Sequence, residues 1–238
     1  MAENIQGLLL NSANALGVRL MPAQTDAFQT YLELLLEWNK KMNLTAITDP
    51  REVCIKHFVD SLTVLDAVEP KTNAKVLDVG SGAGFPGIPL KIAREDIQLT
   101  IIDSLQKRLT FLQEVLDKTH LSAELLHGRA EDFGREKNLR VKFDVVTARA
   151  VAPLNLLCEY CMPFVKKTGF FVAMKGPNYK EELEAAQHAI DVLGCELVGV
   201  KEFMLMDGST RNLLLFQRVK GFSMEYPRPG TKIAKKPI

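Results

Sequence analysis

The chain has 238 residues, of which 47% are hydrophobic and 25% charged, and it carries 30 Lys and Arg against 29 Asp and Glu. A composition so close to the globular average excludes a disordered, collagen-like or disulfide-rich chain. The net charge of +1 provides no protein-wide attraction to RNA or to anionic lipid, so a nucleic-acid function would need a local basic patch.

The sequence shows no pattern of secretion, membrane insertion or metal binding. Met1–Ile5 lack the basic and apolar regions of a secretory signal, and no apolar run approaches the ~18 residues that cross a bilayer. We therefore expect a cytoplasmic protein without membrane contact, in which the cysteines are reduced. Cys158 and Cys161 form a lone CxxC pair, which favours helix packing over a metal or redox site.

The first 70 residues predict a helical extension. Residues 25–42 have the spacing of a helix with one buried face, with Tyr31 and Trp38 at the edge of that face. The apolar positions of this face are Phe28, Leu32, Leu35, Leu36 and Met42. Asp49 and Pro50 lead into a short helix that carries His57, and residues 70–73 end the extension.

Strands and helices alternate from residue 75 onward, in the region 71–220 that we expect to form the core domain. The expected strands are Lys75–Val79, Leu99–Asp103, Ala123–His127, Phe143–Ala148 and Phe170–Met174. The expected helices are Ile88–Ala93, Lys107–Lys118, Leu154–Cys161 and Lys180–Leu193. This order predicts an α/β fold with a parallel sheet covered by helices on both faces. Glu196–Phe203 and Leu213–Val219 follow without a helix between them, which predicts an antiparallel pair at one edge.

Residues 221–238 form a basic, proline-rich tail. From residue 217 onward there are six lysines and arginines against Glu225 alone. Pro227, Pro229, Gly230 and Pro237 argue against a regular helix or strand. The tail is either a solvated terminus, an arm whose Arg228 and lysines neutralise phosphates, or a strap packed on the core.

A glycine-rich loop follows the first expected strand and opens a helix, the context in which such a loop binds a nucleotide-like ligand. It reads Asp78-Val-Gly-Ser-Gly-Ala-Gly-Phe-Pro-Gly. Counted from Gly80, the dinucleotide pattern fails because Phe85 stands at its third glycine position. Asp-x-Gly-x-Gly-x-Gly is instead typical of S-adenosylmethionine enzymes, which makes Asp78, Gly80 and Gly82 candidate cofactor residues.

Two further strand ends favour a nucleoside ligand. Asp103 ends the second expected strand, where a carboxylate faces the crevice and accepts hydrogen bonds from ribose hydroxyls. The alternative is that Asp103 is an exposed strand-end residue that caps the next helix. The third strand is followed by Gly128-Arg-Ala-Glu-Asp, where a backbone N–H of Ala130 or Glu131 could reach an adenine ring.

Several motifs together resemble the small-subunit ribosomal RNA guanine-N7 methyltransferases, also called the glucose-inhibited division protein B family. The resemblance runs from about residue 30 to the C-terminus. Beside the glycine loop, it rests on Asn43-Leu-Thr-Ala-Ile, Lys56-His-Phe-Val-Asp-Ser-Leu, Asp103-Ser with Lys107-Arg, Gly128-Arg-Ala-Glu, Ala148-Arg-Ala-Val-Ala-Pro-Leu and Tyr226-Pro-Arg-Pro-Gly.

The resemblance implies a Rossmann-like sheet of seven strands with the last hairpin reversed. It implies methyl transfer from S-adenosylmethionine to N7 of a guanosine in the 530 loop of 16S rRNA, with the rRNA or the small ribosomal subunit as partner. We expect a monomer. Cofactor contacts carried over by position fall at Gly80, Phe85, Ala130, Glu131 and Arg149.

The residue types agree with attack by a ring nitrogen. Guanine N7 carries no proton, so we expect no general base, and catalysis reduces to positioning in a dry polar site. Candidate cations that position the RNA lie near strand ends: Arg149, Lys175, Arg211, Lys107 and Arg108. Two alternatives stay open, namely a methyltransferase with another substrate and a non-catalytic nucleotide-binding regulator of cell division.

Overall fold

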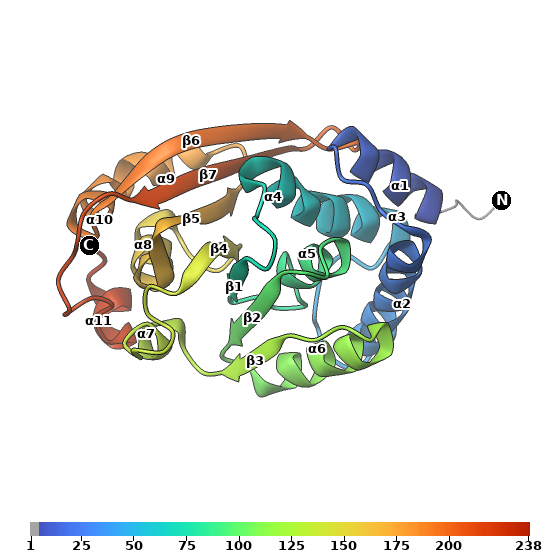
Figure 1. Cartoon of the computed structure of the whole chain (residues 1–238), viewed down its shortest axis with the longest axis horizontal. Helices are drawn as coiled ribbons and strands as arrows, with labels where there is room; N and C mark the ends of the chain where they lie inside the picture. Colours follow the sequence, from blue (N-terminus) through green and yellow to red (C-terminus); the bar gives the residue numbers. More distant parts are fainter. Residues whose placement is uncertain (1–4) are drawn as a thin grey trace.

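A mixed sheet of seven strands forms the centre of the molecule, with the order β3-β2-β1-β4-β5-β7-β6. The computed structural model describes residues 5–238 (Figure 1), so the expectation about a signal sequence falls mostly on residues 1–4, which lie outside the described residues. Within the described residues, no helix is long and apolar enough to cross a membrane.

The strand order confirms the predicted fold. The first five strands are parallel, β7 is antiparallel to β5, and β6 pairs with β7 at the edge. The strands are β1 (Lys75–Val79), β2 (Gln98–Asp103), β3 (Glu124–His127), β4 (Phe143–Arg149), β5 (Val165–Lys175), β6 (Cys195–Met204) and β7 (Thr210–Arg218). β5 begins before the expected residue Phe170, because Val165 already pairs with Phe143 ahead of an irregularity in the ladder.

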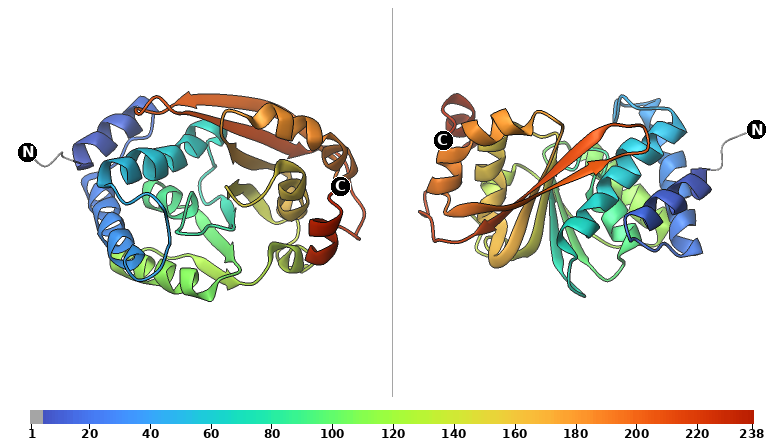
Figure 2. Two further views of the ribbon diagram at one scale, coloured as in Figure 1. Left: turned by 180° about the vertical axis from the view of Figure 1, so that it is seen from behind. Right: turned by 90° about the horizontal axis from the view of Figure 1, so that it is seen from above.

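Helices cover both faces of the sheet (Figure 2). One layer holds α1 (Ile5–Ala15), α2 (Pro22–Asn39), α4 (Asp60–Val68), α5 (Gly87–Ala93) and α6 (Gln106–Thr119). The other holds α7 (Ala130–Phe133), α8 (Leu154–Cys161), η2 (Met162–Phe164), α9 (Tyr179–Ala185), α10 (Gln187–Val192) and α11 (Gly230–Lys235). Each layer buries its own hydrophobic cluster, and the first cluster joins the N-terminal helices to the sheet.

The N-terminal extension packs an aromatic cluster beneath the glycine loop. Tyr31 of α2 was expected at the edge of its helix face, but it is fully buried. Its ring stacks on Phe58 and on Phe85 with centroid distances of 5.3 and 5.4 Å, and its hydroxyl donates to the carbonyl of Ala83. Burial is tolerated because the hydroxyl has this acceptor.

The segment that carries His57 is a distorted helix. Asp49 caps α3 (Pro50–Val53) by accepting a hydrogen bond of 2.9 Å from the backbone N–H of Glu52. A π-helical turn, η1 (Cys54–Val59), then leads into α4 without a break. Such turns are rare and frequently occur at functional sites.

Two predictions about the C-terminal third were wrong. The helix expected over residues 180–193 is divided in two at Ala186, and the tail contains a short helix, α11. Pro229 directly precedes α11, where a proline disturbs no helical hydrogen bond, and Ile233 in α11 is fully buried.

Candidate active site

Two adjoining pockets open at the carboxyl ends of the parallel strands, where ligands bind in doubly wound folds. The glycine-loop pocket, about 310 Å³, lies over β1, β2 and β3 and is lined by Gly80, Asp103, Gly128, Ala130, Glu131 and Tyr160 among others. The arginine pocket, about 780 Å³, is lined by His57, Asp60, Arg149, Lys175, Glu182 and Arg211 among others. Val151 and Ala152, in the loop after β4, line both pockets.

A buried carboxylate shapes the glycine loop. Asp78 is fully buried and accepts hydrogen bonds from the Ser81 hydroxyl at 2.5 Å, the Gly87 N–H at 2.8 Å and the Thr147 hydroxyl at 3.1 Å. Burial raises the pKa of Asp78 to about 6, although these donors oppose the shift. The side chain therefore braces the loop from beneath and does not line the glycine-loop pocket.

Gly80 fits the contact between the glycine loop and the loop after β4. Its φ is +68°, and a Cβ atom there would lie 2.7 Å from Cγ2 of Val151. A larger residue would be strained and would push Val151 away. The glycine at this position thus lets the loop approach the wall shared by the two pockets.

Asp103 lies at the end of β2 and lines the glycine-loop pocket, as predicted. Its carboxylate accepts hydrogen bonds of 2.9 Å from the backbone N–H groups of Gly82 and Leu105, and Arg108 lies 3.4 Å away. Asp103 therefore fixes the glycine loop to the second strand end. Asp103 does not cap α6, the other role that the sequence left open, because the N-cap residue of that helix is Leu105 and no side chain caps it.

Glu131, in the first turn of α7, is the second acid of the glycine-loop pocket. The side chain is buried, and its Oε1 atom has no hydrogen-bond partner among the described residues. Arg129 lies 3.9 Å from this atom and is mostly exposed. A buried carboxylate oxygen without a donor costs free energy, so the packing around this side chain must hold it in place.

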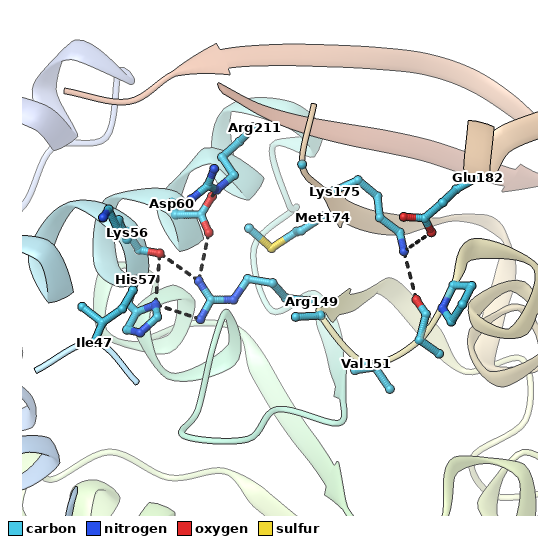
Figure 3. A pocket seen from close by; sticks show the side chains of 14 residues that line it. Ile47, Lys56, His57, Asp60, Arg149, Val151, Met174, Lys175, Glu182 and Arg211 are labelled. Carbon is cyan, nitrogen blue, oxygen red and sulfur yellow. Dashed lines mark hydrogen bonds and ion pairs between the residues drawn. The ribbon is translucent and has the colours of Figure 1, made fainter. Parts of the chain in front are cut away.

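Arg149 points into the arginine pocket (Figure 3). Its guanidinium donates to Asp60 at 2.9 Å and to the carbonyl of Lys56 at 3.1 Å, and it lies 4.9 Å over the ring of Phe85. Arg211 of β7 lies 3.4 Å from the other oxygen of Asp60. One buried carboxylate thus holds two guanidinium groups side by side.

His57 lies beside this cluster and is neutral. Burial, and next the nearby charge of Arg149, lower its pKa to about 3. Its Nε2 lies 2.8 Å from the Thr45 hydroxyl, and its Nδ1 lies 3.2 Å from Arg149 and 3.0 Å from the carbonyl of Lys56. We assign the proton to Nε2, because Nδ1 then accepts from the guanidinium.

Lys175 lies on the opposite side of the arginine pocket from His57. Its ammonium donates to Glu182 at 2.7 Å and to the carbonyl of Ala152 at 2.9 Å. The amine therefore ties the end of β5 to the loop shared by the two pockets.

Most of the predicted residues line one of the two pockets, and the others lie outside both. Gly80, Asp103, Ala130 and Glu131 line the glycine-loop pocket, and Arg149, Lys175 and Arg211 line the arginine pocket. Gly82 touches Asp103 through its N–H, whereas Phe85 is buried in the aromatic cluster, where its ring centroid lies 4.5 Å from that of His57. Lys107 is exposed on α6 and lines neither pocket.

Sequence reasoning missed Asp60 and Glu182. Asp60 lies in the Lys56-His-Phe-Val-Asp-Ser-Leu motif, so the family resemblance could have pointed to it. Glu182 is one of several acids on an exposed helix, and only the folded chain shows that it binds Lys175.

Comparisons with known proteins identify the family of this chain. Residues 24–213 match the family described as GidB, rRNA small subunit methyltransferase G. Relatives called ribosomal RNA small subunit methyltransferase G from Alkaliphilus oremlandii and Desulforamulus reducens are 45% and 48% identical over 236 residues. The first match covers 98% of this chain and 99% of the relative, and the second covers 97% of each.

A solved structure supports the fold. The crystal structure of an S-adenosylmethionine-dependent methyltransferase from Aquifex aeolicus has a TM-score of 0.55 and 20% identity, covering 77% of this chain and 98% of that one. The fold class and the methyltransferase assignment predicted from the sequence are confirmed, and S-adenosylmethionine as cofactor agrees with both comparisons. The chain belongs to the rRNA small subunit methyltransferase G family.

Proposed function

We propose that the chain transfers the methyl group of S-adenosylmethionine to N7 of a guanosine in the 530 loop of 16S rRNA. The observation that supports this most is the pair of adjoining pockets with a common wall at Val151 and Ala152. One pocket has the acids that a nucleoside needs, and the other has cations that suit an RNA. A methyl donor and an acceptor base on either side of this wall would be close neighbours.

The glycine-loop pocket fits the cofactor in its donor set. Asp103 would accept hydrogen bonds from the ribose hydroxyls, and Gly80 would leave room at the turn for close approach of the ligand. Backbone N–H groups at Ala130 and Glu131 would face the adenine. When bound, S-adenosylmethionine supplies an electrophilic methyl group on its sulfonium.

The arginine pocket suits a guanine and its flanking phosphates. It is lined by four cations, Lys56, Arg149, Lys175 and Arg211, and by two acids, Asp60 and Glu182. Glu182 pairs with Lys175, and Lys56 pairs with Glu52 outside the pocket lining. The surplus positive charge therefore lies on Arg149 and Arg211, which share Asp60. A guanidinium can donate two hydrogen bonds to guanine O6 or to a phosphate.

The titratable groups also suit a reaction without a general base. N7 of guanine already presents a lone pair, and its attack on the methyl group releases no proton from N7. Asp60 and Glu182 are held by arginine and lysine partners, and His57 is held between Thr45 and Arg149. The task that is left to the pocket is to hold the acceptor in line with the methyl group.

The test is methylation of 16S rRNA by the purified chain, followed by mapping of N7-methylguanosine. We expect the modification in the 530 loop, on free rRNA or on the assembled small subunit, when S-adenosylmethionine is supplied. Both substrates should be tried, since the pocket chemistry fits either. Methylation of another base or another molecule would contradict the proposed substrate. The proposal thus includes 16S rRNA as the substrate, and action in the cytoplasm as a monomer.

A further inference from the structure

The C-terminal strap, residues 226–238, packs on the far side of the helices that wall the glycine-loop pocket. Its helix α11 contacts α8, and Ile233 is fully buried. Helix α11 lies beside α7 in Figure 1, and Ile238 packs against the hydrophobic cluster that includes the buried face of α8. α7 provides Ala130 and Glu131 to the pocket, and α8 provides Tyr160.

Arg228 fastens the strap to α8 through a buried ion pair. Its backbone N–H and its Nε donate to Oε1 of Glu159 at 2.7 and 2.9 Å, and its Nη2 donates to Oε2 at 2.7 Å. The Glu159 side chain is only 1% exposed. Because both carboxylate oxygens are engaged, this contact fixes the orientation of α8 beside Tyr160, the next residue in the chain.

Gly230 approaches the pocket wall itself. A Cβ atom at this position would lie 1.9 Å from Oε1 and 2.9 Å from Cδ of Glu131. Any side chain at residue 230 would therefore displace the buried carboxylate of a pocket-lining residue. A Cβ atom at Gly134, directly after α7, would lie 2.9 Å from Cγ of Pro227, and Arg140 donates to the carbonyl of Tyr226 at 2.7 Å.

We propose that the C-terminal strap is a positioning element of the cofactor pocket, in which Gly230 sets the place of Glu131 and Arg228, through Glu159, sets the place of α8. The inference rests on the proposed function in one respect, namely that S-adenosylmethionine occupies the glycine-loop pocket. It also assigns Arg228 a structural partner, so this arginine is not available to neutralise a phosphate. Lys232, Lys235 and Lys236 remain exposed.

The first test measures S-adenosylmethionine binding by isothermal titration to the full chain and to Gly230→Ala. We expect the dissociation constant to rise at least about fivefold in the variant, because the methyl group displaces Glu131. The matched control is Thr231→Ala, at the exposed next position, which should bind as the wild type does. In steady-state assays the KM for cofactor should rise while the KM for RNA stays unchanged, a division that a general loss of stability would not produce.

A second test uses the unmodified chain and so does not depend on the folding of a variant. If the strap supports the pocket, saturating S-adenosylmethionine must in turn stabilise the strap, because coupling between sites is reciprocal. Amide hydrogen exchange in residues 226–238 should slow when the cofactor is added. Unchanged exchange, or wild-type affinity in Gly230→Ala, would overturn the inference alone. A wild-type chain that shows no binding would contradict the proposed function as well.

Discussion

Two buried carboxylates, Asp78 beneath the glycine loop and Asp60 in the arginine pocket, are held by different means. Asp78, beneath the glycine loop, accepts from two hydroxyls and one backbone N–H, all of them neutral and all from β4 or the glycine loop itself. Asp60, in the arginine pocket, is held by Arg149 and Arg211, which come from β4 and β7. Neutral donors give the glycine loop a fixed shape, whereas two guanidinium groups around one carboxylate leave a positive excess at an open pocket. The first arrangement suits shape recognition and the second suits an anionic partner.

The largest effect is expected from Asp60→Asn. The substitution leaves two guanidinium groups side by side without their anion, and losing one partner of a buried ion pair typically costs about 3 kcal/mol. We expect a loss of that size in the free energy of unfolding, measured by denaturant titration. Methyl transfer to RNA should fall as well, because Arg149 and Arg211 lose their common support.

The control lies in the same helix. Asp66 of α4 pairs with Lys201, but both side chains are more than 40% exposed. Asp66→Asn should therefore change the free energy of unfolding by less than about 1 kcal/mol. Equal losses in the two variants would show that the Asp60 cluster is no more than a surface ion pair.

Arg149→Ala should distinguish the function of the arginine pocket from that of the glycine-loop pocket. The sequence assigned Arg149 to both cofactor and RNA, while its guanidinium lies in the arginine pocket. We expect kcat/KM for RNA to fall by roughly a hundredfold, from loss of charged hydrogen bonds worth about 2–3 kcal/mol, with little change in cofactor affinity. Arg149→Lys should recover only part of the lost kcat/KM, since a lysine lacks the planar, two-pronged guanidinium. A large loss of cofactor affinity in Arg149→Ala would instead assign this residue to cofactor binding.

The same division explains what the sequence could predict. The glycine-loop pocket is built from short segments that each follow a strand, so local pattern and strand order were enough to indicate Gly80, Asp103 and Ala130. The arginine pocket joins residues about 90 positions apart, such as Asp60 and Arg149, and no local pattern pairs them. For Tyr31 and Arg228, the apolar spacing and the charge count gave no sign of the buried acceptors that hold them.

Asp103→Ala tests the glycine-loop pocket, and it should affect the cofactor and not the RNA, the reverse of Arg149→Ala. Removing the carboxylate deprives the ribose hydroxyls of a charged acceptor and also frees the N–H of Gly82. S-adenosylmethionine binding should weaken by ~1–3 kcal/mol in isothermal titration, with RNA affinity unchanged. Asp117→Ala, at an exposed position of α6, is the matched control. Cofactor affinity equal to that of the wild type would remove Asp103 from the site.

The pH dependence of stability should have opposite signs in the two pockets. His57 has a folded pKa of about 3, below its ordinary 6.5, so the unfolded chain binds more protons and stability falls as the pH drops below 6.5. Asp78 has a folded pKa of about 6, above its ordinary 3.8, so the folded chain binds more protons and stability rises as the pH drops through 6.

The smallest net effect is therefore expected in the wild type between pH 7 and pH 5. On acidification from pH 7 to pH 5, protonation of His57 in the unfolded chain lowers the free energy of unfolding by about 2 kcal/mol. Protonation of Asp78 in the folded chain raises it by about 1 kcal/mol, so the net loss stays near 1 kcal/mol. His57→Gln should lose the first contribution, and its free energy of unfolding should gain about 2 kcal/mol relative to the wild type on acidification. Asp78→Asn should lack the contribution of Asp78, and its free energy of unfolding should fall by about 1 kcal/mol more than that of the wild type. Denaturant titrations of the three proteins at both pH values measure these differences, and parallel changes in all three would show that neither group titrates as its burial requires.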